Sequence, residues 1–309
     1  MAISIPDSAD QLPAGIEPAQ AESRPEERER GFRRGWRQLR RDRGAMIAIA
    51  FLVLLVLVAV FWSHLAPFDP NKQSLRDKLQ SPNGTHWLGT DDFGRDTLSR
   101  LLSACRVSLL AAGEAVGVAV LLGVGPGLVA GYVGGWVDAA MSRFTDGLLA
   151  LPPLIIALAI VGVLGPSLTN SMLAVGIIFS PRFFRLARGS ASSARREGYV
   201  EALESLGCSR ARIIGLHILP NTIAVLLVEL AITAGAAITA EASLSFLGLG
   251  VSPPQASWGG MVRNGFRYVN NTIWPILPPV ILVILTIMAF TYLGEGIRRV
   301  VTRSNRVGE

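Results

Sequence analysis

Long apolar runs alternate with shorter polar segments along most of this 309-residue chain. Six of the runs are close to the roughly 20 residues that a helix needs to cross the apolar core of a membrane. They cover residues 46–63, 107–131, 147–165, 171–187, 222–248 and 276–294. Because backbone inside a membrane must satisfy its own hydrogen bonds, such runs are expected to be helical. The pattern predicts an all-α membrane protein with six transmembrane helices.

Composition agrees with a membrane protein. Hydrophobic residues make up 50% of the chain and charged residues only 17%, a balance that soluble domains rarely have. The net charge of +6 is explained by Arg residues near the inner membrane surface, which attract anionic lipid, so we expect lipid contact and no nucleic acid partner. Cys105 and Cys208 are predicted on opposite sides of the membrane and cannot pair. His64, His86 and His217 are scattered, which argues against a metal site.

Basic residues indicate how the predicted helices are oriented, because Lys and Arg accumulate on the cytoplasmic side. If the N-terminus is cytoplasmic, 21 of the 29 Lys and Arg residues fall on that side of the membrane. Both termini are therefore predicted to be cytoplasmic. The first apolar run is not followed by a convincing small-residue cleavage site, which indicates an uncleaved anchor rather than a signal peptide.

The expected organisation has four parts. Residues 1–44 form an Arg-rich cytoplasmic tail whose composition is typical of disorder. Residues 45–104 hold the first transmembrane helix and an extracytoplasmic segment, 105–300 form the membrane core, and 301–309 are a short cytoplasmic tail. Within 31–43, dense Arg residues with interspersed apolar ones fit either a helix on the membrane surface or a simple stop-transfer cluster.

A segment between two of the apolar runs has the pattern of a soluble helix pair. The residues on its predicted apolar face are Tyr199, Ala202, Leu203 and Leu206. Glu201 and Glu204 fall on the opposite, polar side. Gly207 suits the left-handed position that ends a helix, and Ser209 is positioned to cap a second one. Pro220 indicates that the next element starts afresh, so the sequence predicts helix, tight turn, helix.

Several residues of this segment match a motif of a known family. They are Glu201, Ala202, Gly207, Leu219 and Pro220. Their spacing resembles the cytoplasmic coupling loop of bacterial ABC import permeases, although Leu203 stands where a second Ala is usual and His217 where Ile is usual. We call residues 188–220 the 188–220 loop. The resemblance implies that this loop docks into a groove on an ATPase subunit. Packing of the amphipathic helix on its own chain is the alternative.

Two further segments resemble the C-type permease of dipeptide, oligopeptide and nickel importers. The first is His-Trp-Leu-Gly-Thr-Asp-Asp-Phe-Gly-Arg-Asp-Thr-Leu-Ser-Arg over 86–100, in which Thr90 or Asp91 is a candidate helix cap. The second is Glu-Ala-Ser-Leu-Ser-Phe-Leu-Gly-Leu-Gly over 241–250, followed by Pro-Pro and Trp-Gly. The resemblance implies a type I ABC importer permease fold in the bacterial inner membrane.

The same resemblance implies partners rather than a cofactor in this chain. The expected partners are a homologous second permease, two ATPase subunits that bind ATP and Mg, and an extracytoplasmic solute-binding protein. The chain itself lacks a phosphate-binding loop, which needs Gly-Lys followed by Ser or Thr, because Lys72 and Lys78 are its only lysines and neither follows Gly. We therefore expect no enzymatic activity and no catalytic residues in this chain.

Three carboxylates, Glu114, Glu229 and Glu241, fall inside predicted helices, where an ionised carboxylate costs about a few kcal/mol. They are candidates for lining the transport path or for an interface or buried hydrogen bond, and the motif position of Glu241 favours a structural role. If Glu114 and Glu229 carried protons, the chain would be a secondary transporter. A membrane-embedded enzyme is a third class, without a recognisable motif.

The expected cargo is a short peptide delivered by the binding protein. The predicted membrane helices contain no histidine, so imidazole ligands for nickel are missing from the path. Import of nickel or another small solute by the same architecture is the alternative.

Overall fold

The computed structural model describes residues 39–40 and 42–306, with side chains to residue 302. Its elements are α2 (Arg43–Leu65), η1 (Leu75–Asp77), α3 (Thr97–Val133), α4 (Gly135–Ala150), α5 (Pro153–Leu164), α6 (Leu168–Ala194), α7 (Gly198–Ser205), α8 (Arg210–Ile213), η2 (Ile214–Ile218), α9 (Leu219–Leu247), α10 (Trp258–Phe266) and α11 (Leu277–Arg306). Over these residues the only β pairing is one isolated bridge, between Thr90 and Asp96. The predicted all-α class is confirmed. Most of the predicted disordered tail lies outside the described residues.

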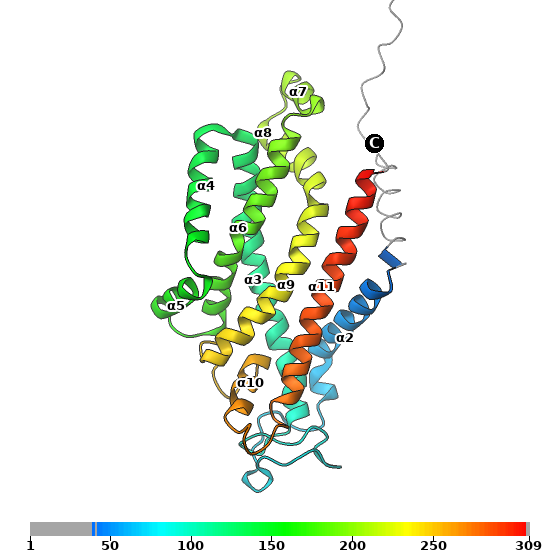
Figure 1. The fold of residues 1–309 in the computed structure, drawn as a ribbon, viewed down its shortest axis with the longest axis vertical. Coiled ribbons are helices and arrows are strands. Elements are labelled where there is room, and N and C mark those ends of the chain that lie inside the picture. Colours follow the sequence, from blue (N-terminus) through cyan, green and yellow to red (C-terminus); the bar gives the residue numbers. More distant parts are fainter. Residues whose placement is uncertain (1–38, 41, 307–309) are drawn as a thin grey trace, which may run out of the picture.

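The long helices lie roughly along one axis, and short elements gather at its two ends (Figure 1). Residues 195–209, with α7 between them, are at one end, which we call the α7 end. Residues 66–96 and 248–276, which include α10, are at the other, the α10 end. The start of α2 and the end of α11 both lie toward the α7 end.

Of the described helices, four are long and apolar enough to cross a membrane: α2, α3, the helix from Arg210 to Leu247, and α11. A fifth candidate is the pair α4 and α5, which is bent by 94° at its break. The predicted span over 147–165 is therefore not one helix, since Pro152 lies at the break and α5 has only 12 residues. The predicted span over 171–187 lies within α6, which is not among the sufficiently apolar helices.

The helix predicted to start near residue 107 begins ten residues earlier, at Thr97. Its cap is Asp96, whose carboxylate accepts a hydrogen bond from the Ser99 amide at 2.8 Å. The prediction of Thr90 or Asp91 as the cap is wrong, because both residues belong to the turn that precedes the helix. A capping side chain must lie next to the first helical turn, and Thr90 and Asp91 precede that turn by several residues.

Small residues on α3 allow it to pack closely against α6. At Gly123, Gly127 and Gly131, one turn apart, an added Cβ would collide with backbone carbonyl oxygens of α6. Gly125 instead faces open space. Such small-residue seams let two backbones approach inside a membrane. The seam joins the parts of α3 and α6 nearest the α7 end, where the 188–220 loop begins.

Pro220 does not start a separate element. Helix α8 continues through the π-helical turn η2 into α9, and the amide of Leu219 donates to the carbonyl of Ile214. Pro220 lies in the first turn of α9, where the missing N–H of proline is tolerated. The wider π turn before it accommodates the loss of the hydrogen bond that proline cannot donate. The prediction of a fresh start at this proline is therefore wrong.

Candidate functional site

The short helix α7 forms the tip of the α7 end (Figure 1). It ends at Ser205, Leu206 is its C-cap, and Gly207 follows with φ of +76°, which confirms the predicted left-handed turn. The amide of Gly207 donates to Glu204 O and that of Cys208 to Leu203 O, each at 3.0 Å. An added Cβ at Gly207 would meet open space, so only the backbone conformation requires glycine here.

The side of α7 that packs against the rest of the chain includes Val200, which is not part of the apolar face identified in the sequence. Val200 is 1% exposed and packs with Ile213 and Ile218 in a cluster that includes residues of α3 and α6. Of the residues on the predicted apolar face, Leu203 is partly buried and packs against this cluster. Tyr199, Ala202 and Leu206 are exposed. A two-turn helix has apolar residues on two sides, and helical spacing alone does not show which side its own chain covers.

Glu204 makes a contact that the sequence did not indicate. Its carboxylate accepts a hydrogen bond of 2.6 Å from the hydroxyl of Tyr132, in the last turn of α3. Tyr132 is 2% exposed. Glu204 was expected on a purely polar face, and no motif points to a residue 72 positions away in the sequence.

The motif residues divide into two groups. Glu201, Ala202 and Gly207 are exposed on α7 and its following turn. Leu219 and Pro220 are half-buried in the first turn of α9. Beside the first group, partial burial raises the pKa of the Tyr199 hydroxyl, which is therefore a neutral hydrogen-bond donor at neutral pH. The exposed group provides a mixed apolar and acidic surface.

Arg residues connect the helices that carry this surface. Arg188 on α6 pairs with Asp138 on α4, and the guanidinium of Arg195 donates to the carbonyl of Val133 at 3.1 Å. Arg185 and Asp146 form a further pair at 2.8 Å, with side chains that are 58% and 57% exposed. Exposed pairs of this kind contribute little to stability.

Glu241 is enclosed by its own chain in this structure. It is 0% exposed, and its carboxylate accepts hydrogen bonds from Ser245 at 2.8 Å and from Ser108 of α3 at 3.3 Å. The Ser108 hydroxyl in turn accepts from the backbone amide of Trp258 at 3.1 Å. The carboxylate thus connects α9 with α3 and α10, an arrangement that fits a structural role.

Glu114 and Glu229 are half-buried on α3 and α9. Glu229 accepts a hydrogen bond of 3.1 Å from Thr233 in its own helix. No hydrogen bond to the Glu114 side chain is found among the described residues. In that same part of the chain, no group of three or more His, Cys, Asp or Glu side chains is arranged to hold a metal ion.

The α10 end contains a compact polar network. Asp91 pairs with Arg95 at 2.6 Å and with Arg100 at 3.4 Å, and both guanidinium groups are nearly buried. His86 contacts the capping Asp96 at 2.9 Å. These groups come from one stretch before and within the first turn of α3, so the network fixes the entry of the chain into that helix.

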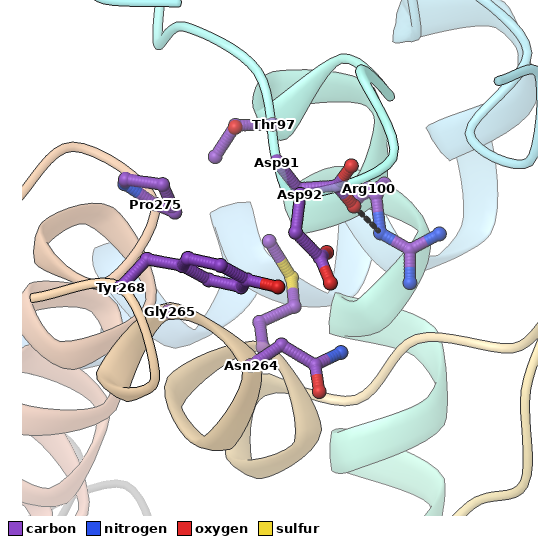
Figure 2. Close-up of a pocket in the computed structure, with 9 residues that line it drawn as sticks. Asp91, Asp92, Thr97, Arg100, Asn264, Gly265, Tyr268 and Pro275 are labelled. Atoms are coloured by element: carbon purple, nitrogen blue, oxygen red, sulfur yellow. Dashed lines mark ion pairs between the residues drawn. The ribbon is translucent and has the colours of Figure 1, made fainter. Parts of the chain in front are cut away.

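A small pocket lies between this network and α10 (Figure 2). The side chains of Asp92 and Tyr268 point toward each other across it. Burial raises the pKa of Asp92, and the charge of Asp91 adds to the effect. The pocket has a volume of about 10 Å³, which suits one water molecule and does not accommodate a transported solute.

Two families match different parts of the chain. Residues 123–307 match the family described as binding-protein-dependent transport system inner membrane component. Residues 32–82 match the family described as the N-terminal TM domain of oligopeptide transport permease C.

Similar proteins cover most of the chain. The dipeptide transport system permease protein of Alkalihalophilus pseudofirmus is 36% identical over 86% of this chain and 88% of its own length. A probable D,D-dipeptide transport system permease protein of Escherichia coli is 40% identical, with 80% and 83% coverage. A glutathione transport system permease protein of Pectobacterium atrosepticum is 36% identical, with 86% and 89% coverage.

The fold is also similar to that of a solved structure. A chain of the MetNI methionine ABC transporter, in an inward-facing conformation, matches with a TM-score of 0.50 and 15% identity. The match covers 62% of this chain and 92% of that chain. At this identity it supports the type I importer fold alone.

Proposed function

This chain belongs to the family of binding-protein-dependent transport system inner membrane components, and on that basis we propose that it is the permease subunit of an ATP-driven importer of short peptides. The observation that carries the proposal is the near full-length similarity to permeases named for dipeptides, D,D-dipeptides and glutathione. All three cargoes are short peptides. His64 and His217 lie near the ends of the helices that cross the membrane, and the apolar stretches between those ends contain no histidine, which supports peptide over nickel.

In the proposed topology α6 and the bent pair of α4 and α5 cross the membrane as well, which gives six spans with both termini in the cytoplasm of a bacterium. The positions of the α2 start and the α11 end, toward the α7 end, support this arrangement. The distribution of basic residues supports the same orientation. An impermeant maleimide added to right-side-out vesicles should miss Cys208 and label Ser81→Cys in a Cys-free background. Labelling of Cys208 from outside would reverse the orientation.

The proposed ATPase contact is the exposed surface of α7. Leu206, which directly follows α7, is 81% exposed, and Tyr199 and Glu201 are exposed on α7 itself. An exposed leucine beside an acidic group suits a partner groove that is apolar at its floor and basic at its rim. A second permease packs beside this one, and the solute-binding protein contacts the α10 end. ATP and Mg bind to the two ATPase subunits.

The proposed mechanism is a two-state rocking motion. ATP binding closes the ATPase dimer and moves α7, and the long helices follow because α7 is packed on the ends of α3 and α6. The path then opens toward the binding protein, which releases its peptide. Nucleotide drives the change only because it binds one of the two states better.

Reconstitution with the cognate ATPases and binding protein tests the proposal. We expect ATP-dependent uptake of labelled di- to pentapeptides and no accumulation of labelled nickel. Nickel uptake without peptide uptake would contradict the peptide cargo. Peptide uptake that needs no ATPase would instead support a proton-coupled secondary transporter.

A matched pair of variants tests the docking surface. Leu206→Ser should reduce the ATPase that co-purifies in mild detergent by about tenfold, since it removes an exposed apolar anchor. Leu75→Ser, at a residue 75% exposed at the α10 end, should leave co-purification unchanged. Equal recovery of ATPase with both variants would contradict docking at α7.

A further inference from the structure

Helix α7 is attached to the long helices in two different ways. One is the apolar cluster in which Val200, Ile213 and Ile218 pack against α3 and α6. The other is the hydrogen bond from the Tyr132 hydroxyl to the Glu204 carboxylate, at 2.6 Å. Apolar contact is non-directional and tolerates sliding, whereas a hydrogen bond to a charged acceptor has a defined geometry. Of the two, the hydrogen bond is the one that fixes the position of α7 along α3.

Tyr132 is well placed to transmit a displacement of α7. It lies in the last turn of a 37-residue helix, about 55 Å long at 1.5 Å per residue. The other half of this helix carries Ser108, which binds the backbone of Trp258 at the α10 end. A force on the Tyr132 hydroxyl therefore acts on an element that reaches both ends of the molecule.

The surroundings of Tyr132 favour such a role. Its ring is held in the apolar cluster and its side chain is 2% exposed, so the hydroxyl has little freedom to follow α7 by changing rotamer. Arg195, just before α7, donates to the carbonyl of Val133, the residue next to Tyr132. The last turn of α3 is thus connected to the loop at two adjacent residues.

We infer that Tyr132 is a coupling residue, which acts by positioning Glu204 and thereby makes α3 follow α7 when the ATPases close. The inference rests on the proposed function, since it assigns a role within the ATP-driven cycle. The apolar cluster keeps the loop attached, and the hydrogen bond converts its movement into movement of α3. Loss of the hydroxyl should leave the complex assembled but reduce transport per ATP.

The test uses the full complex in proteoliposomes and compares Tyr132→Phe with wild type. ATP hydrolysis and peptide uptake are measured on the same preparation, because their ratio does not depend on the amount of folded protein. We expect ATP hydrolysis within twofold of wild type and uptake per ATP reduced about tenfold, the size of one hydrogen bond to a charged group. Tyr292→Phe, at a half-exposed tyrosine of α11, is the matched control and should change neither quantity.

A double-mutant cycle distinguishes the effect of losing this hydrogen bond from other effects of changing either side chain. Glu204→Gln keeps an acceptor but removes its charge, so it should lower uptake per ATP by a smaller factor than Tyr132→Phe. Because Glu204 is an exposed residue, this variant should fold even if Tyr132→Phe does not. The double variant should be no worse than Tyr132→Phe alone, since both changes act on one bond.

The outcomes distinguish the inference from the proposed function. If wild type shows no ATP-dependent peptide uptake, the proposed function fails. If wild type transports and either variant retains the wild-type uptake per ATP, the inference is overturned while the permease assignment stands. Multiplied losses in the double variant would also overturn it, because they would show that the two side chains act separately.

Discussion

The two ends of the molecule are held together by different kinds of contact. At the α10 end, Arg95 and Arg100 are 5% and 4% exposed and converge on Asp91. At the α7 end, the charged side chains of Arg195 and Glu204, which bond to Val133 and Tyr132 of α3, are both exposed. The α10 end is therefore built around buried charges, and the α7 end around exposed ones.

This difference sets how each end responds to displacement. When the partner of a buried charge moves away, the charge is left neither paired nor hydrated. A change in the geometry of the α10 end therefore costs much free energy. An exposed pair separates at little cost because water replaces the partner. We infer that the α10 end is the rigid part of the chain and that the α7 end is the part built to move.

The largest expected effect comes from a matched pair of glycines that both have left-handed backbone, Gly94 with φ of +69° and Gly207 with φ of +76°. At Gly94 an added Cβ would overlap the carbonyl of Ser74, whereas at Gly207 it meets open space. Gly94→Ala should cost about 4 kcal/mol or more and prevent recovery of folded protein, because backbone must shift. Gly207→Ala should cost only about 1 kcal/mol, from backbone strain.

Recovery of the monodisperse protein in detergent and its thermal midpoint are the measurements for this pair. Similar recovery of both variants would show that the α10 end is as adaptable as the α7 end. The Gly207 variant also reports on transport, since a reoriented turn changes how α7 meets its partner.

A smaller effect is expected from removing one charge from the buried network of the α10 end and, for comparison, one from the exposed pair between α4 and α6. Arg95→Met should lower the free energy of unfolding by about 3 kcal/mol, since it leaves a nearly buried Asp91 with Arg100 alone. Arg185→Met, the control, should lower it by less than about 1 kcal/mol, because that pair is exposed. Thermal unfolding in detergent compares them, and equal shifts of the midpoint would contradict the contrast between buried and exposed charges.

The smallest effect concerns Asp92, whose pKa is raised by burial and by the neighbouring Asp91 charge. Below the ordinary aspartate pKa the group is protonated in both folded and unfolded chains and costs nothing. As the pH rises through the raised folded pKa, ionisation is opposed in the folded state and stability is lost. Asp92→Asn should therefore be more stable than wild type at neutral pH, by less than about 1 kcal/mol because Arg95 and Lys78 offset part of the penalty.

The gain from Asp92→Asn should disappear in acid, where wild type carries the protonated group. Asp69→Asn, at an exposed aspartate of the same segment, serves as the control for loss of a carboxylate. Unfolding midpoints measured across the acid range check both variants. A gain that persists below the ordinary aspartate pKa would show that charge is not its cause.

Local features of the fold were predictable because neighbours in the sequence produce them. Apolar runs in the sequence indicated the long helices. Gly207 indicated the left-handed turn after α7, because a helix end of this kind needs a residue that tolerates positive φ. Where several neighbours suit the same task, prediction was less exact. Thr90, Asp91 and Asp96 are all capable caps, and only the path of the chain selects Asp96.

The candidate site was predictable in part. The motif located α7 and its turn, and Glu201, Ala202 and Gly207 are indeed exposed there. The packed face of α7 was not predictable, because Val200 is buried by residues of helices α3 and α6 that lie elsewhere in the sequence. The contact of Glu204 was not predictable either, because nothing in the sequence distinguishes it from a glutamate that faces solvent, and only the fold places Tyr132 beside it.

The sequence by itself determined that this chain is helical, that it contains helices apolar enough for a membrane, and that a short amphipathic pair interrupts them. Those properties follow from composition and period, which act over a few turns of helix. Only the tertiary structure decided that Glu241 is enclosed by three helices and that Tyr132 holds Glu204. Each of these depends on which helix faces meet, and close packing of distant segments fixes that choice.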